Sequence, residues 1–239
     1  MHKLILTWII TGFSIMASFG QNQITYKKKK LIYSDSFGKQ VDSSDWQIEM
    51  PFDSSNRVFV ANNRLWLDTK DGVTVWYKQP LKGNYCIEYN RCVVVDSGAN
   101  DRLSDMNNFW QASDPKNPRL FTRDGVFESY DNLQLYYAGI GGNYNSTTRL
   151  RRYGGSKEKP VIKEYLDSGH LLKPNHIYNI HIVYLNHTTQ LYVDGDLWFS
   201  FTDTKPLPTG YFGLRSTKSR QWVSGLKIWT IKQAGIRTD

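Results

Sequence analysis

"LYVDGDLWFSFTDTKPLPTGYFGLRS", residues 191–216, decides the fold of this 239-residue chain. Asp194 and Gly195 lie between two runs that are rich in β-branched and aromatic residues. An Asp-Gly pair is one that a two-residue turn between antiparallel strands prefers, because both turn residues need a positive φ. The stretch therefore predicts a β-hairpin centred on Asp194-Gly195.

Runs of the same β type recur along the rest of the chain, and almost nothing shows a helical period. In residues 178–184 the alternation predicts a strand with Ile180 and Ile182 on one face and His181 on the other. No repeat of fixed period and no linker divides the chain, which favours one domain. The sequence thus predicts an all-β fold, a two-sheet antiparallel β-sandwich of jelly-roll type.

Two further segments, read together with residues 191–216, resemble a known superfamily: "YSDSFGKQVDSSDWQIE" (33–49) and "VSGLKIWTI" (223–231). They are similar to the opening and closing segments of concanavalin A-like lectins and glucanases, including secreted bacterial domains that act on polysaccharides, such as a keto-disaccharide hydrolase group. The resemblance implies a concanavalin A-like sandwich that binds sugar on its concave sheet. It also leaves a structural calcium ion open, although the sequence does not locate its site. No other cofactor is predicted.

The N-terminal residues 1–20, "MHKLILTWIITGFSIMASFG", have the pattern of a cleaved signal peptide: His2 and Lys3, then an apolar run, then small residues. The apolar run is shorter than the ~20 residues that cross a bilayer, so no membrane span is predicted. We therefore expect a basic lead-in at 21–30, a single carbohydrate-active domain at 31–234, and a secreted or periplasmic location.

The chain is basic, with 30 Lys and Arg residues against 22 Asp and Glu residues and a formal net charge of +8. Such a surplus favours an anionic partner, unless it is simply carried by solvated lysines such as Lys27–Lys30. Together with export, it favours an acidic polysaccharide or oligosaccharide as the ligand. Nucleic acid is disfavoured, because the protein is expected to be exported and no basic stripe recurs at regular spacing. No protein partner is predicted.

Cys86 and Cys92 are the only cysteines, and both fall in one predicted strand within residues 84–95. Six residues of strand separate them by roughly 20 Å, which is too far for a disulfide. We expect two buried free thiols. The sequence also lacks His-x-His and His-Glu-x-x-His spacing, so no metal site is predicted.

The segment "TTRLRRY", which ends at Tyr153, carries the chemistry that indicates an enzyme. As a strand it places Arg149, Arg151 and Tyr153 on one face. Arginine forks match carboxylates and tyrosine can supply a proton, which suits a polysaccharide lyase that cleaves beside a uronic acid by β-elimination. We expect Arg149 or Arg151 to neutralise the carboxylate. His181 is the candidate base, and Tyr153 or Tyr137 is the candidate acid for the leaving oxygen.

Amide groups and aromatic rings supply candidate sugar contacts, because amides bond to hydroxyl groups and ring faces pack on sugar rings. The segment "DMNNFWQASDP" and the Arg-, Tyr- and Gly-rich stretch 123–153 contain most of them. The candidate substrate-binding residues are Asn107, Asn108, Trp110, Arg123, Tyr136, Asn143 and Asn145.

Two other functions stay open at this point. A glycoside hydrolase of the same fold would use Asp124 and Glu128 as its carboxylates. Residues i and i+4 of a strand are roughly 13 Å apart, however, and a hydrolytic pair lies closer, so the segment would have to bend. A noncatalytic glycan-binding module needs only the amides and the aromatic rings.

Overall fold

The Asp194-Gly195 hairpin forms as predicted in the computed structural model, which describes residues 23–234. Asp194 and Gly195 have φ values of 54° and 91°, and they join β11 (Thr188–Val193) to β12 (Asp196–Thr202). The turn therefore uses positive φ at both central residues, which is the reason that an Asp-Gly pair occupies it.

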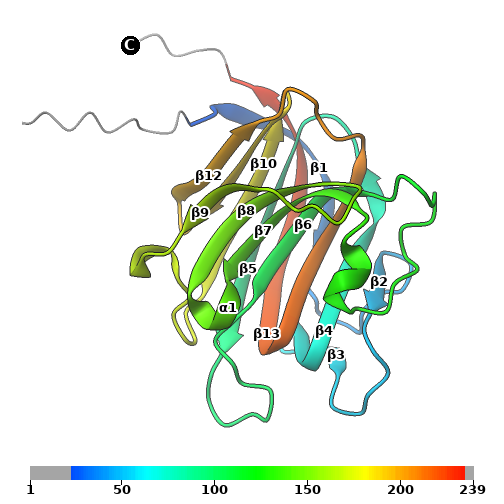
Figure 1. Cartoon of the computed structure of the whole chain (residues 1–239), viewed down its shortest axis with the longest axis vertical. Helices are drawn as coiled ribbons and strands as arrows, with labels where there is room; N and C mark the ends of the chain where they lie inside the picture. The colour runs from blue at the N-terminus through cyan, green and yellow to red at the C-terminus, as the bar shows by residue number, and fades with distance from the viewer. Residues whose placement is uncertain (1–22, 235–239) are drawn as a thin grey trace, which may run out of the picture.

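Antiparallel strands in two layers make up most of the described chain (Figure 1). The predicted β-sandwich is therefore confirmed. The helical segments are single turns: η1 (Phe127–Tyr130), α1 (Gly142–Asn145) and η2 (Ser168–His170). The remaining strands are β1 (Tyr26–Asp35), β2 (Trp46–Glu49), β3 (Arg57–Ala61), β4 (Arg64–Leu81), β5 (Tyr85–Val94), β6 (Met106–Ser113), β7 (Gln134–Gly141), β8 (Thr147–Gly154), β9 (Val161–Tyr165), β10 (Tyr178–Leu185) and β13 (Gly210–Gln233).

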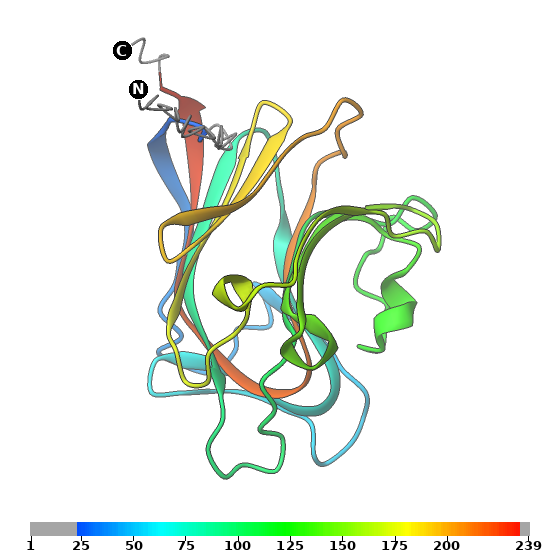
Figure 2. The same cartoon turned by 60° about the vertical axis from the view of Figure 1, so that its left-hand side comes forward.

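β13 is the strand on which the two layers meet. Its first part pairs with β6, its later part pairs with β5 and β1, and β4 pairs with it along both parts. The sheet order is β12-β11-β10-β5-β13-β6-β7-β8-β9. Figure 2 shows that the sheet bends back on itself along β13, so that β5 and β10–β12 face β6–β9 across the core.

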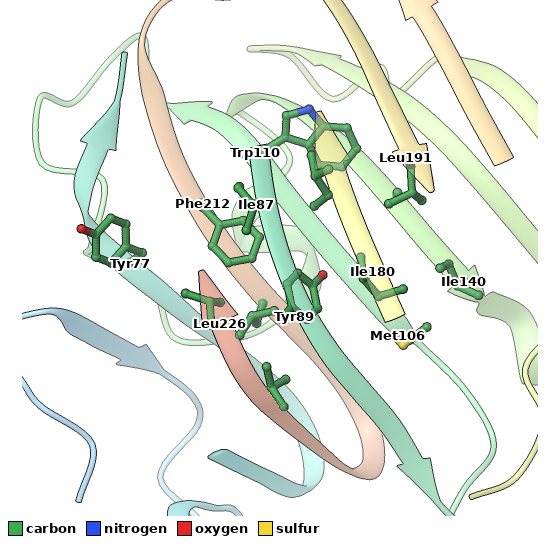
Figure 3. Close-up of a cluster of buried hydrophobic side chains, with 14 of the residues drawn as sticks. Tyr77, Ile87, Tyr89, Met106, Trp110, Ile140, Ile180, Leu191, Phe212 and Leu226 are labelled. Atoms are coloured by element: carbon green, nitrogen blue, oxygen red, sulfur yellow. The ribbon is translucent and has the colours of Figure 1, made fainter. Parts of the chain in front are cut away.

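The core between the layers is aliphatic and aromatic. β10 contributes Ile180 and Ile182 to it, which confirms the predicted alternation along this strand. Figure 3 shows Ile180 in one cluster with Leu191, Trp110 and Phe212, so that both layers supply large side chains. Burial of this apolar surface is the main term that holds the layers together.

Arg91 of β5 is fully buried within this core and joins three strands. Its Nη2 donates to the carbonyl oxygen of Arg215 on β13 at 2.6 Å, and its Nη1 donates to the carbonyl oxygen of Asn107 on β6 at 2.8 Å. Its Nε donates to Gln221 Oε1 at 2.8 Å. These acceptors are uncharged, and burial lowers the pKa of Arg91 to about 10. A guanidinium buried here tolerates no loss of acceptors, so it fixes the register of β5, β6 and β13.

Within the basic lead-in expected at 21–30, Lys27–Lys30 belong to β1, which pairs with the end of β13. Their side chains are exposed along an edge strand, where lysines prevent further strand pairing. The predicted signal peptide at 1–20 lies outside the described residues. Within 23–234, no helix is long and apolar enough to cross a membrane.

Cys86 and Cys92 both lie in β5, and both are buried and free, as predicted. Burial raises the pKa of Cys86 to about 12 and that of Cys92 to about 11. Both thiols are therefore protonated at neutral pH, and neither has the low pKa of a catalytic nucleophile.

Replacing Gly195 with Ala is expected to lower the free energy of unfolding by about 1–2 kcal/mol, because a side chain is strained at this positive φ. Gly154→Ala is the control: an added Cβ there meets only the end of the Arg152 side chain, at 3.9 Å. Denaturant unfolding measures both variants. An equal loss in the two would contradict the special role of the turn.

Candidate functional site

A cavity of about 600 Å³ lies on the outer face of the layer that contains β13, β6, β7 and β8. The strands of this layer curve around it, and the loop that carries η1 stands opposite them (Figure 2). Basic groups outnumber acidic groups on its walls. The basic lining residues are Arg149, Arg151, Lys159, Arg215 and Lys218, and the acidic ones are Asp71, Asp105 and Glu128.

Strand register places a row of residues across the cavity floor. Arg215 on β13 pairs with Asn107 on β6, Asn107 pairs with Gly139 on β7, and Gly139 pairs with Arg149 on β8. Residues paired directly across antiparallel strands share one face of the sheet. With strands ~4.8 Å apart, the row spans ~14 Å, with cations at both ends and an amide between them.

The Tyr137 side chain packs directly against Gly139, the residue of this row that has no side chain. The Tyr137 hydroxyl donates to Asn107 Oδ1 at 3.0 Å. An added Cβ at Gly139 would lie 2.1 Å from the Tyr137 hydroxyl oxygen, so only glycine leaves room for the ring. Burial raises the pKa of Tyr137, so its hydroxyl keeps its proton at neutral pH.

β8 turns one face to the cavity, with Thr147, Arg149, Arg151 and Tyr153 all in its lining, as the alternation predicts. The Tyr153 hydroxyl is buried and has no hydrogen-bond partner among the described residues. Burial raises the pKa of Tyr153, and the Lys159 ammonium lies 5.7 Å from its ring centre. A buried hydroxyl without a partner is rare, and here it lines a cavity in which a ligand could supply the missing bond.

Arg215 is fully buried at the β13 end of the row. Its Nη1 donates to Thr74 Oγ1 at 3.0 Å and to the carbonyl oxygen of Gly125 at 2.9 Å, and both acceptors are uncharged. Its guanidinium lies 4.9 Å from the ring centres of Phe127 and Tyr130. Like the Tyr153 hydroxyl, its Nε is buried and unpartnered within the described part of the chain.

Two other cations of the cavity have acidic partners. Arg149 forms an ion pair with Glu164 on β9. Lys159 pairs with Asp131, and its carbonyl oxygen accepts a hydrogen bond of 2.5 Å from Arg151 Nη1. Arg149 and Lys159 therefore already have acidic partners, whereas the bonds of Arg151 and Arg215 go to uncharged oxygens.

Glu49 fastens the loop that forms the opposite wall. This buried carboxylate accepts from the Arg123 backbone N–H at 2.8 Å, from Trp76 Nε1 at 2.7 Å and from the Tyr130 hydroxyl at 2.8 Å. Burial raises the pKa of Glu49, while these donors act in the opposite direction. The carboxylate thus ties both ends of residues 123–130 to the sheet and holds η1 beside the cavity.

The segment that contains Asp124 and Glu128 is a loop followed by η1, not a strand. Glu128 is exposed and lines the cavity, whereas Asp124 does not line it. Asp105, which also lines the cavity, pairs with Arg102 at 3.3 Å. Glu128 and Asp105 are thus carboxylates that the cavity brings near its tyrosines and arginines.

The structure divides the site residues that the sequence predicts into two sets. The set that lines the cavity comprises Asn107, Tyr137, Asn143, Arg149, Arg151 and Tyr153. The set outside the cavity lining comprises Asn108, Trp110, Arg123, Tyr136, Asn145 and His181.

His181 lies in the opposite layer, on the face of β10 that points away from the core. Its neighbours there are Glu88, whose Oε1 is 3.8 Å from His181 Nδ1, and Lys28, which pairs with Glu88. Burial lowers the pKa of His181, so the imidazole is neutral at neutral pH. Its position separates it from the tyrosines and arginines of the cavity by the thickness of the sandwich.

Three more of the predicted site residues outside the cavity lining point into the core. Trp110 Nε1 donates to Thr189 Oγ1 at 2.8 Å, and Asn108 Oδ1 accepts from Arg91 at 3.2 Å. The Tyr136 hydroxyl donates to Asp203 at 2.8 Å. The remaining two stabilise loops: Arg123 pairs with Asp114 and Asn145 bonds to the backbone of Leu172.

Sequence reasoning missed Arg215, Lys159 and Asp105. A signal for Arg215 was present, because Phe212 and Leu214 are core residues and the alternation puts Arg215 on the opposite face. Lys159 and Asp105 enter from loops, where no periodicity indicates direction. Among the described residues, no group of three or more His, Cys, Asp and Glu side chains could hold a metal ion.

Gly139→Ala is expected to displace the Tyr137 ring and to destabilise the fold by about 1–3 kcal/mol, because the added methyl group overlaps the Tyr137 hydroxyl. Gly154→Ala in β8 is again the control. Thermal unfolding and near-ultraviolet circular dichroism measure stability and tyrosine packing. An unchanged aromatic spectrum in Gly139→Ala would argue against the contact.

Glu49→Gln is expected to cost about 1–3 kcal/mol, because the amide nitrogen would replace one acceptor where three donors converge. Proteolysis within residues 114–130 should become faster than in the parent protein. Asp53→Asn is a control at an exposed carboxylate that accepts from the Ser55 backbone. Equal protection of the loop in Glu49→Gln and the parent protein would contradict the anchoring role.

Several solved structures resemble this chain in fold, although their sequences differ from it at most positions. A Bacillus subtilis protein of unknown function with a galectin-like fold matches with a TM-score of 0.70 and 13% identity, over 88% of this chain and 100% of its own. The endo-β-1,3-glucanase of Pyrococcus furiosus gives 0.60 and 12%, over 86% and 95%. The carbohydrate-binding module CBM66 of B. subtilis gives 0.54 and 10%, over 78% and 96%.

These matches confirm the concanavalin A-like fold that the terminal segments indicate, and at such identities they show the fold alone. No curated protein matches the sequence. One family model does match, over residues 67–226, which include β6, β7, β8 and the part of β13 that carries Arg215. The chain belongs to the family described as "Domain of unknown function (DUF6250)".

Proposed function

We propose that this protein binds an acidic glycan in the cavity and cleaves it beside a uronic acid by β-elimination. The observation that carries the proposal is the unpartnered, buried hydroxyl of Tyr153 in a cavity whose basic residues outnumber its acidic ones. A glucanase and a carbohydrate-binding module share the fold, which supports a glycan as ligand. We also propose that residues 1–20 direct export, which would bring the protein to such a polymer.

The reaction needs three groups: a cation for the carboxylate, an acceptor for the C5 proton, and a donor for the leaving oxygen. The acceptor removes the C5 proton, the C4–O bond breaks, and a C4=C5 double bond forms. Tyr153 gives its proton to the leaving oxygen and regains one from solvent. No water is consumed, so one product carries an unsaturated uronate.

The unpartnered hydroxyl supports Tyr153 as the acid. Its raised pKa keeps the hydroxyl protonated at neutral pH, and no bond within the described residues competes for that proton. The Tyr137 hydroxyl, in contrast, is already bonded to Asn107. Because His181 lies on the other layer, the C5 proton goes to a carboxylate of the cavity, Glu128 or Asp105.

Two other activities use the same cavity. A hydrolase would employ Glu128 and Asp105 as its carboxylates, and the fold of an endo-β-1,3-glucanase favours that alternative. A binding module would hold the glycan without cleaving it, as the fold of CBM66 suggests. The products distinguish all three functions.

The protein is expected to produce unsaturated uronate, followed by its ultraviolet absorbance, when it is mixed with a panel of uronate-containing polysaccharides. Reducing ends should appear in step. Tyr153→Phe is expected to reduce the rate about 10²-fold or more, since the proton donor is lost. Tyr85→Phe, which removes a buried hydroxyl bonded to Gln111 in the core, is the matched control.

Reducing ends without the unsaturated product would move the assignment to hydrolysis. Binding without either product would leave a glycan-binding module. Full activity in Tyr153→Phe would remove Tyr153 from the mechanism while leaving elimination intact.

A further inference from the structure

We propose that Arg215 receives the carboxylate of the uronic acid, through its unpartnered Nε. This inference rests on the proposed glycan site and goes further, because it assigns the acid group to one residue. Arg215 lines the cavity, is fully buried, and keeps one N–H without an acceptor. Buried charges are normally paired, so the free N–H of a buried cation beside a cavity indicates an anionic ligand.

The charge of Arg215 is only partly offset by its surroundings. Its bonds run to two hydroxyl groups, of Thr74 and Thr217, and to a backbone carbonyl, and the rings of Phe127 and Tyr130 add cation–π contacts. Asp105 is the carboxylate that acts on it electrostatically, and Asp105 already pairs with Arg102. A carboxylate from the ligand would supply the missing counter-charge, and its planar oxygens match a guanidinium.

The two arginines of β8 are less suited to this role. Arg149 would have to give up its ion pair with Glu164. Arg151 is half-exposed, so water screens its attraction for an anion more strongly than it screens that of Arg215. The charge of Arg215 also acts on the Tyr153 hydroxyl, so the two side chains approach each other in the cavity although their strands are not adjacent. A uronate bound there would meet the cation at its carboxylate and the proton donor at its leaving oxygen.

Thr217 allows a test that leaves Arg215 in place. Its Oγ1 lies 3.5 Å from Arg215 Nη2, and its side chain is half-exposed on the cavity wall. Thr217→Asp places a carboxylate beside the guanidinium and satisfies the cation internally. Thr217→Asn has the same shape without the charge.

Calorimetry would compare both variants with a uronate oligosaccharide, its carboxyl-reduced neutral form and a sulfated neutral oligosaccharide. The uronate oligosaccharide is expected to bind Thr217→Asp at least ~10-fold more weakly than Thr217→Asn, because an ion pair close to Arg215 must be displaced. The neutral form should bind both alike. The sulfated form should not show the 10-fold difference, and the melting temperature of Thr217→Asp should be the higher of the two.

Gly142→Asp adds the same charge to the cavity wall at α1, beyond β6 and β7 from Arg215, and controls for general repulsion. Its effect on uronate binding should be clearly smaller. Equal loss in Gly142→Asp and Thr217→Asp would overturn the assignment, as would equal uronate binding by Thr217→Asp and Thr217→Asn. A sulfated ligand as sensitive as the uronate would also contradict a carboxylate site.

These outcomes are separate from those of the cleavage assay. If no product forms but Thr217→Asp weakens uronate binding selectively, elimination fails and the Arg215 assignment stands. If unsaturated product forms and charge discrimination is the same in both Thr217 variants, the reaction stands and Arg215 is not its carboxylate receptor.

Discussion

The buried guanidinium of Arg91 is the constraint on which the cavity depends. From β5 it donates to the carbonyl oxygens of Arg215 and Asn107, and so it links one layer to the two strands at the centre of the other. An apolar side chain would tolerate a shift of register that leaves the core filled. Arg91 does not, because each lost bond would strand a charged donor away from water. The two residues whose backbones it holds are neighbours in the row across the cavity floor.

Buried polar groups on the core side and on the cavity side of β6 and β13 differ in their hydrogen bonding. On the core side, the N–H groups of Arg91 meet carbonyl and amide oxygens. On the cavity side, Arg215 keeps an N–H without an acceptor and Tyr153 keeps a hydroxyl without a partner. Each guanidinium nitrogen of Arg91 therefore has an acceptor in the core, whereas Arg215 Nε and the Tyr153 hydroxyl have none within residues 23–234. Asn108 Nδ2 and Ser113 Oγ are also buried without a partner among the described residues, but they do not line the cavity, so a ligand bound there would complete only Arg215 and Tyr153.

The sequence predicted the parts of the fold that periodicity and turn chemistry control. The hairpin at Asp194-Gly195 and the alternation of β10 and β8 follow from local rules, and the structure agrees with them. Periodicity shows which side chains leave the core, but it does not show on which outer face they emerge. His181 leaves the core on one layer and Tyr153 on the other.

The sequence also does not show which of two adjacent polar residues faces the cavity. Asn107 and Asn108 are adjacent in a segment that reads as polar, yet only Asn107 faces the cavity. The choice depends on how β6 pairs with β13, a contact between residues about a hundred positions apart. The loop that carries η1 was equally out of reach, because Glu49, its anchor, acts through tertiary hydrogen bonds alone.

β13 also determines when the molecule can become complete. It pairs with β1, β4, β5 and β6, yet it is the last strand of the described chain to be synthesised. Until the ribosome has made it, the strands before it lack their central neighbour, and the two layers cannot close. The core of such a chain is buried only after nearly all of its strands have been made, so closure of the two layers follows synthesis of the chain and does not accompany it.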